Sequence, residues 1–149
     1  MSSRSTTDRS RTLTVSCFRS GPLTLALSGD TRRCPALIEA AQRADLLVHE
    51  VFVHRDLRGP PGVEAAGTFA NIARYHTLSS EVGKVAAQAE VKALALTHFV
   101  PPGAVRAALL AEVQADFTGP VVLAEDLLRI DLAARRVIHR DAFLALGSV

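Results

Sequence analysis

Residues 76–98 read HTLSSEVGKVAAQAEVKALALTH, and this stretch decides the fold. Its first part, residues 79–90, has apolar side chains at helical spacing: Val82, Val85, Ala86 and Ala89. Thr77 or Ser79 is suited to cap that helix at its N-terminus. The run at 92–97, KALALT, predicts a short buried strand. A helix that leads directly into an apolar strand is the unit from which largely parallel sheets are built.

The same alternation of strands and helices extends along the rest of the chain. Strands are expected at 13–18, 22–28, 45–50 and 121–124, and helices at 35–44 and 104–117. The first two strands flank Gly21 and predict a hairpin. Residues 127–132 and 137–140 predict a second hairpin that completes the sheet. The fold class is therefore α/β, with a mixed sheet.

Composition limits the classes of protein to consider. The chain has 149 residues and 48% apolar character, which fits one domain. Residues 1–11 hold three arginines against one aspartate and read as a disordered tail, whereas residues 12–149 balance at fourteen basic and fourteen acidic side chains. That balance argues against a dedicated nucleic-acid-binding module, which needs a dense positive face.

Targeting and redox signals are weak. No window approaches the roughly 18 consecutive apolar residues of a membrane span, and the first residues lack the apolar core of a secretory signal. Cys17 and Cys34 have no CxxC spacing and form no disulfide framework. We therefore expect a soluble, cytoplasmic protein with no membrane contact.

Polar residues follow three of the expected strands at the point where each strand ends. Asp30 comes after LTLALSG, Glu50 after DLLVH and His98 after KALALT. The carboxyl ends of parallel strands meet at one edge of a sheet, so these side chains are expected to lie close together. Carboxylate oxygen and imidazole nitrogen suit Zn²⁺ or another borderline divalent cation. His76, just before a helix, is placed to join them.

Each of these residues also has an ordinary structural interpretation. Asp30 is equally suited to cap the helix that follows it, and His98 to be a hydrogen-bonded histidine in the core. Glu50 and His49 can simply end a strand in solvent.

The remaining histidines and Cys34 are weaker candidates for a functional site. His54 and His139 stand among charged residues and are expected at the surface. Cys34 near a helix start invites a nucleophile reading, but no base stands beside it in sequence. No GxGxxG, Walker A or GxSxG pattern occurs. Residues 54–75 read as a long loop, which we expect to contact a substrate or a partner.

The ordered motifs resemble a known superfamily. The segments SGDTRRC, ADLLVHEVF, YHTLSSEVGKVAAQAEVKALALTHFVPP and GPVVLAEDLLRIDL resemble the second half of a metallo-β-lactamase-fold hydrolase, in the branch of ribonuclease Z and arylsulfatase-like enzymes. The similarity covers roughly residues 19–132. By this resemblance, residues 12–149 form the C-terminal half of an αββα sandwich, with helices on one face of the sheet.

The resemblance also implies roles for the polar residues. Asp30 would bridge two zinc ions and His98 would bind the second ion. His76 and Glu50 would act as a catalytic proton relay behind the metal ligands. The family's HxHxDH signature is absent, because the chain has no histidine before His49. The site would therefore be incomplete.

These features imply a zinc-dependent hydrolase of a phosphodiester, sulfate ester or other ester. The lone chain would be inactive, or active only when a homodimer or a chain carrying the N-terminal half completes the site. Two alternatives stand beside it: a non-catalytic or relic module that packs on a partner through an exposed apolar face, and a fragment of a tRNA 3′-processing endonuclease.

Overall fold

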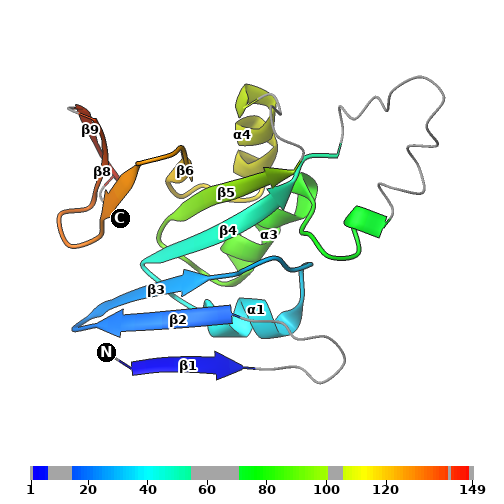
Figure 1. The fold of residues 1–149 in the computed structure, drawn as a ribbon, viewed down its shortest axis with the longest axis horizontal. Helices are drawn as coiled ribbons and strands as arrows, with labels where there is room; N and C mark the ends of the chain where they lie inside the picture. Colours follow the sequence, from blue (N-terminus) through cyan, green and yellow to red (C-terminus); the bar gives the residue numbers. More distant parts are fainter. Residues whose placement is uncertain (1, 7–14, 55–70, 101–105, 141, 148–149) are drawn as a thin grey trace.

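The computed structural model describes residues 2–6, 15–54, 71–100, 106–140 and 142–147. Its main feature is a sheet of six strands in the order β1-β2-β3-β4-β5-β6. These strands are β1 (Ser2–Thr6), β2 (Val15–Ser20), β3 (Leu23–Leu27), β4 (Leu46–Phe52), β5 (Leu94–Val100) and β6 (Val121–Leu123). The pairs β1–β2 and β2–β3 are antiparallel, and β3 to β6 run parallel (Figure 1). The predicted α/β class with a mixed sheet is confirmed.

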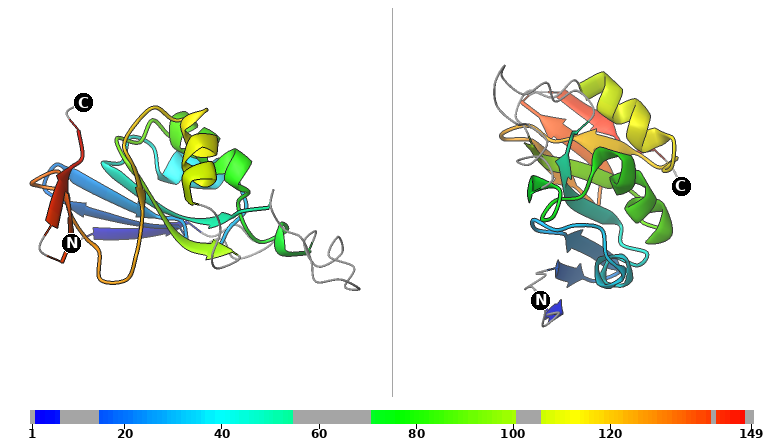
Figure 2. Two further views of the ribbon diagram at one scale, coloured as in Figure 1. Left: turned by 90° about the horizontal axis from the view of Figure 1, so that it is seen from above. Right: turned by 90° about the vertical axis from the view of Figure 1, so that its right-hand side faces the viewer.

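Three helices lie on one face of this sheet. They are α1 (Pro35–Ala40), α3 (Ser79–Gln88) and α4 (Arg106–Gln114). Seen from above, all three lie on the same side of the strands (Figure 2). Parallel strands require crossover connections, and the helices on one face supply them.

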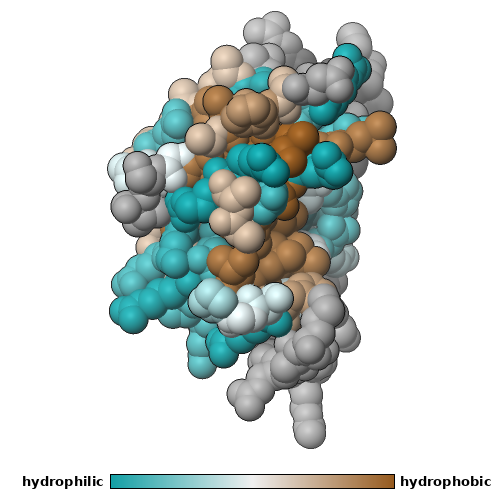
Figure 3. Space-filling model, turned by 90° about the vertical axis from the view of Figure 1, so that its left-hand side faces the viewer, coloured by the Kyte–Doolittle hydropathy of each residue, from teal (hydrophilic) through white to brown (hydrophobic). Residues whose placement is uncertain are grey.

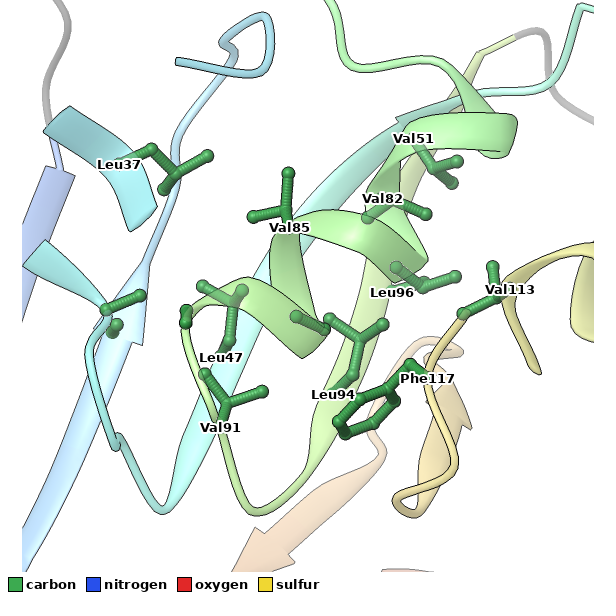
Figure 4. Close-up of a cluster of buried hydrophobic side chains, with 14 of the residues drawn as sticks. Leu37, Leu47, Val51, Val82, Val85, Val91, Leu94, Leu96, Val113 and Phe117 are labelled. Atoms are coloured by element: carbon green, nitrogen blue, oxygen red, sulfur yellow. The ribbon is translucent and has the colours of Figure 1, made fainter. Parts of the chain in front are cut away.

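The core fills the space between the helices and the sheet. Alternate residues of the strands meet the buried side of the helices, as Figure 4 shows for Leu47, Leu94 and Leu96 against Val82 and Val85. All five of these side chains are fully buried, at 0% exposure. Burial of one such side chain contributes roughly 1.5–3 kcal/mol, so this layer holds the strand ends in fixed positions.

Helices α3 and α4 approach each other closely at Gly83. A Cβ atom at this position would lie 2.5 Å from the carbonyl oxygen of Val113 in α4. Glycine therefore allows the backbone of α3 to contact α4.

The second hairpin does not complete the main sheet as predicted. Strands β7 (Arg129–Asp131) and β8 (Arg136–His139) form a separate sheet with β9 (Ala142–Ala145). The chain turns away after β6, where the Leu128 N–H donates to the Glu125 carbonyl and Leu127 has a φ of 66°. This small sheet lies near the ends where β4 and β5 begin (Figure 1).

The helix-free face of the main sheet is partly covered. Ile130 and Leu132 pack against Leu46, Ala93 and Ala95, which are 3%, 2% and 1% exposed. The large apolar patch expected on this face is therefore reduced by the C-terminal segment. Exposed large apolar side chains of the described residues lie at Tyr75, Leu127, Phe143 and Leu144, and Figure 3 shows the apolar surface on the β8–β9 side.

The structure describes only part of the predicted N-terminal tail and of the predicted long loop. Ser2–Thr6, expected within a disordered tail, pair with β2 as the edge strand β1. The free backbone groups of β2 provide the template for this pairing. Residues 7–11 of the expected tail and residues 55–70 of the expected loop lie outside the described residues. None of the helices in the described ranges has the length and apolar character that crossing a membrane requires.

Candidate metal centre

The loop after β3 presents Asp30 beyond the carboxyl end of the sheet. Its first residue, Ser28, is 1% exposed and donates its N–H to the Val48 carbonyl at 3.0 Å. The Ser28 hydroxyl in turn lies 3.4 Å from the Glu50 N–H and accepts from it. Gly29 then adopts a φ of 60°, which favours glycine, and the chain turns there. Asp30 is left with an exposed carboxylate.

Glu50, in β4, is buried and fully engaged. Its side chain is 2% exposed, and its Oε1 accepts the Thr77 N–H at 2.7 Å. Its Oε2 lies 2.9 Å from Nδ1 of His76. Burial raises the pKa of this carboxyl group, and the hydrogen bonds from Thr77 and His76 act in the opposite direction. Glu50 thus holds the His76 ring from behind.

A β-bulge in β5 places His98. The register pairs Glu50 with Thr97 and Val51 with Phe99, so His98 is the extra residue between them. His98 has a φ of 44°, a conformation that costs a non-glycine residue roughly 1–2 kcal/mol. Bulges change the direction of a side chain next to functional sites. Nδ1 of His98 consequently lies 2.8 Å from Oδ1 of Asp30.

Asp30, His76 and His98 form one cluster of possible metal ligands. One ligand atom from each lies within 4.8 Å of the others. The rings of His76 and His98 meet edge to face, with centroids 5.5 Å apart and planes at 71°. One carboxylate and two imidazoles are a donor set that suits a borderline divalent cation. The residues present therefore fit a metal ion, with room in the donor count for further ligands.

The structure contradicts the ordinary structural interpretations of the polar residues that the sequence allowed. Asp30 does not cap α1, because the N-cap is Cys34 and the Asp30 carboxylate contacts His98. His98 is not a core histidine, since its side chain is 51% exposed. Glu50 and His49 do not end a strand in solvent, because both are buried.

His49 is the most isolated polar group near the cluster. It is fully buried on β4, and its Nδ1 lies 2.6 Å from the Glu50 carbonyl oxygen. Its Nε2 has no hydrogen-bond partner among the described residues. Burial lowers the pKa of His49 to about 4, so the ring is neutral near pH 7.

Thr77 has a role that the sequence analysis did not assign. It was expected to cap α3, but the N-cap is Leu78 without a side-chain hydrogen bond. The Thr77 hydroxyl instead donates to the Thr31 carbonyl at 2.7 Å. Thr31 and Thr77 both lie in the quoted segments SGDTRRC and YHTLSSEVGK, directly after Asp30 and His76, and this adjacency is a sequence signal for the contact.

The remaining candidates lie elsewhere. Cys34 lines an open groove between α1 and α3 together with Arg33 and Glu81, away from the metal ligands. His54 and His139, expected at the surface, are half-buried, and Nδ1 of His54 lies 3.4 Å from the Ser79 hydroxyl.

The chain is similar in sequence and in fold to several known proteins. No protein-family model matches the chain. A protein of Mycobacterium tuberculosis is 38% identical over 97 residues, which are 65% of this chain and 31% of that protein. The ribonuclease Z of Myxococcus xanthus is 36% identical over 116 residues, covering 74% of this chain and 33% of that enzyme. The crystal structure of YhfI from Bacillus subtilis, a metallo-β-lactamase fold protein, matches with a TM-score of 0.62 and 25% identity, over 83% of this chain and 45% of YhfI.

The chain carries part of a metallo-β-lactamase fold and is related to ribonuclease Z. This confirms the resemblance read from the ordered motifs. The chain spans about a third of the length of the curated relatives it matches. Within the described residues, the cluster gathers one aspartate and two histidines.

Proposed function

We propose that this chain contributes one half of the active site of a metal-dependent hydrolase that cleaves phosphodiesters. The observation that carries the proposal is the convergence of Asp30, His76 and His98, with the buried Glu50 behind His76. These residues come from four separate segments of the chain, and only the parallel sheet brings them to one edge.

Asp30 and His98 are the residues that would hold the metal. Both are exposed at the edge, and neither is needed to satisfy a buried group. We take zinc as the first candidate because nitrogen and oxygen donors are its usual ligands when thiolates are absent. A bound divalent ion would supply Lewis-acid chemistry, which activates water and stabilises developing negative charge.

His76 would move a proton at the leaving oxygen. With the Glu50 carboxylate accepting at Nδ1, the proton of the neutral ring stays on Nδ1, and Nε2 is the free nitrogen. The ring would first take up a proton at Nε2 from water and then release it to the leaving oxygen, and the Glu50 carboxylate would stabilise the doubly protonated ring between these two steps. His76 is 15% exposed, so it can reach a substrate while its orientation stays fixed by the carboxylate.

The substrate class rests on the relatives. Four of the curated relatives are named ribonuclease Z, an enzyme class that acts on phosphodiesters. The balanced charge of residues 12–149 favours a small phosphodiester over a long RNA strand, which needs a positive track. Sulfate esters, other esters and precursor tRNA are the competing substrates, and tight binding of tRNA that weakens strongly with salt would favour the last.

The rest of the site would come from another segment or chain. Asp30 and His98 alone fall short of a two-metal centre, and the relatives are about three times as long as the matched region. A chain that carries the HxHxDH ligands, or a second copy of this one, would complete the site.

The test is hydrolysis of bis(p-nitrophenyl) phosphate with added Zn²⁺ or Mn²⁺. The chain is assayed alone and together with a chain that carries the HxHxDH segment of a related ribonuclease Z. We expect metal-dependent hydrolysis that His76→Ala lowers by about 10²-fold or more, the range of one general acid–base group. Hydrolysis that Asp30→Ala and chelation both leave unchanged would refute the proposal.

A second candidate is a non-catalytic module that packs against a partner. The observation that favours it is β9, an edge strand whose four residues are all exposed and include Phe143 and Leu144. Unprotected apolar edge strands pair readily with other chains. A stable heteromeric complex with no metal-dependent activity in any combination would favour this candidate.

A further inference from the structure

Thr77 occupies a central place in the hydrogen-bond network behind the metal ligands. It is fully buried, and its polar groups contact both β4 and the loop after β3. The amide donates to Oε1 of Glu50 at 2.7 Å, and the carbonyl accepts from the Phe52 N–H at 2.9 Å. The hydroxyl donates to the Thr31 carbonyl at 2.7 Å.

The position of these contacts in the chain gives them their significance. Thr31 directly follows Asp30, and Thr77 directly follows His76. The hydroxyl contact therefore connects the segment of the metal ligand Asp30 with the segment of His76, at one residue from each. The amide and carbonyl contacts fix Thr77 on β4, whose partner strand β5 carries His98.

The other end of the Asp30 loop is fixed separately. Ser28 is held by β4 through the Val48 carbonyl and the Glu50 N–H. Between Ser28 and Thr31, Gly29 has a positive φ and the Asp30 side chain is exposed. Without the Thr77 hydroxyl, the described contacts would hold the far end of this loop less firmly, and the Asp30 carboxylate would have a wider range of positions.

We propose that Thr77 is a positioning residue for the metal centre, whose buried hydroxyl keeps the Asp30 loop beside His76 and at the distance from His98 that a shared ion requires. The inference rests on the proposed function, since it takes Asp30 and His98 as metal ligands and His76 as the proton-transfer group beside them. Partners outside the ligand shell commonly change metal affinity by about 10- to 100-fold. Thr77 would act through the backbone of a ligand segment rather than through a ligand ring.

The test compares Thr77→Val, which keeps the shape and loses the hydroxyl, with Thr77→Ser, which keeps the hydroxyl. Thr24→Val, in a half-buried position of β3, is the matched control. Zn²⁺ affinity of the purified chain is measured by titration calorimetry. We expect Thr77→Val to weaken binding by about 10-fold or more, and Thr77→Ser and Thr24→Val to stay near the wild-type value.

A second readout needs no metal. The ¹⁵N resonances of the His98 ring report its hydrogen bond to Asp30, and amide hydrogen exchange reports the order of residues 29–31. Thr77→Val should shift the His98 resonances and speed exchange in this loop, and Thr77→Ser should do neither. If the wild type binds no Zn²⁺ but these changes occur, the metal centre fails and the positioning role stands. If Thr77→Val folds and leaves ring resonances and exchange unchanged, or loosens the loop without weakening measured Zn²⁺ binding, the inference is overturned.

Discussion

At the scale of single residues, the backbone conformation of His98 leads to a prediction about the free energy of unfolding. Its φ of 44° favours glycine over any residue with a Cβ atom. We therefore expect His98→Gly to unfold at higher urea concentration than His98→Ala, with a difference of about 1 kcal/mol. Both variants lose the contact with Asp30, so the comparison isolates the backbone. Equal stability of the two variants, or a more stable alanine variant, would show that the bulge is absent.

The burial of His49 predicts how the stability of the fold depends on pH. Its pKa is lowered from 6.5 to about 4 in the folded protein, so the unfolded chain takes up the proton first. Above pH 6.5 the neutral ring therefore contributes roughly 3 kcal/mol to the free energy of unfolding. This contribution is lost as the pH falls toward 4.

The variant His49→Asn removes this titration while keeping an N–H donor near the Nδ1 position. Denaturant unfolding between pH 4 and 7 should show a smaller loss of stability for the variant than for the wild type. Parallel curves for the two proteins would mean that the ring is not buried as described.

At the scale of elements, the close contact between α3 and α4 predicts that alanine at position 83 destabilises the protein, although alanine forms helices better than glycine does. A Cβ at Gly83 would meet the Val113 carbonyl oxygen at 2.5 Å. We expect Gly83→Ala to destabilise the fold by about 1–3 kcal/mol, as overpacking does. Lys84→Ala, at the next and exposed position of α3, is the control and should change stability little. Thermal unfolding would separate the two, and a stabilised Gly83→Ala would contradict the packing.

Local sequence patterns predict helices and strands well where burial of one face fixes the spacing of the apolar residues. The strands around Leu47 and Leu94 and the buried side of α3 follow directly from their apolar spacing. Helix ends were less predictable, because Thr77 and Asp30 are good caps whose side chains are engaged by distant segments instead. No local pattern records a contact across 46 or 68 residues of sequence.

The bulge had a signal that the sequence analysis did not use. Leu94 and Leu96 face the helices at strand spacing, but the next residue packed against that core is Phe99. The interval from Leu96 to Phe99 is odd, which requires one extra residue in the strand. That extra residue is His98.

At the scale of the whole molecule, topology brings the candidate site together. Asp30 follows β3, and Glu50 and His98 lie near the carboxyl ends of β4 and β5, so their convergence was predictable from the order of three neighbouring parallel strands. The separate β7–β9 sheet was not, because the turn at Leu127 depends on backbone angles rather than on apolar period. Cytoplasmic location, partner and substrate stay predictions.

The proposed function depends on metal binding by Asp30 and His98, beside His76. The most direct measurement is equilibrium dialysis of the purified chain against Zn²⁺, followed by elemental mass spectrometry, for the wild type and Asp30→Asn. Asp126→Asn, at an exposed position, serves as the control. We expect about one zinc per wild-type and control chain, and a clear loss of zinc in Asp30→Asn. Zinc-free wild-type protein, or equal zinc in Asp30→Asn, would contradict this expectation.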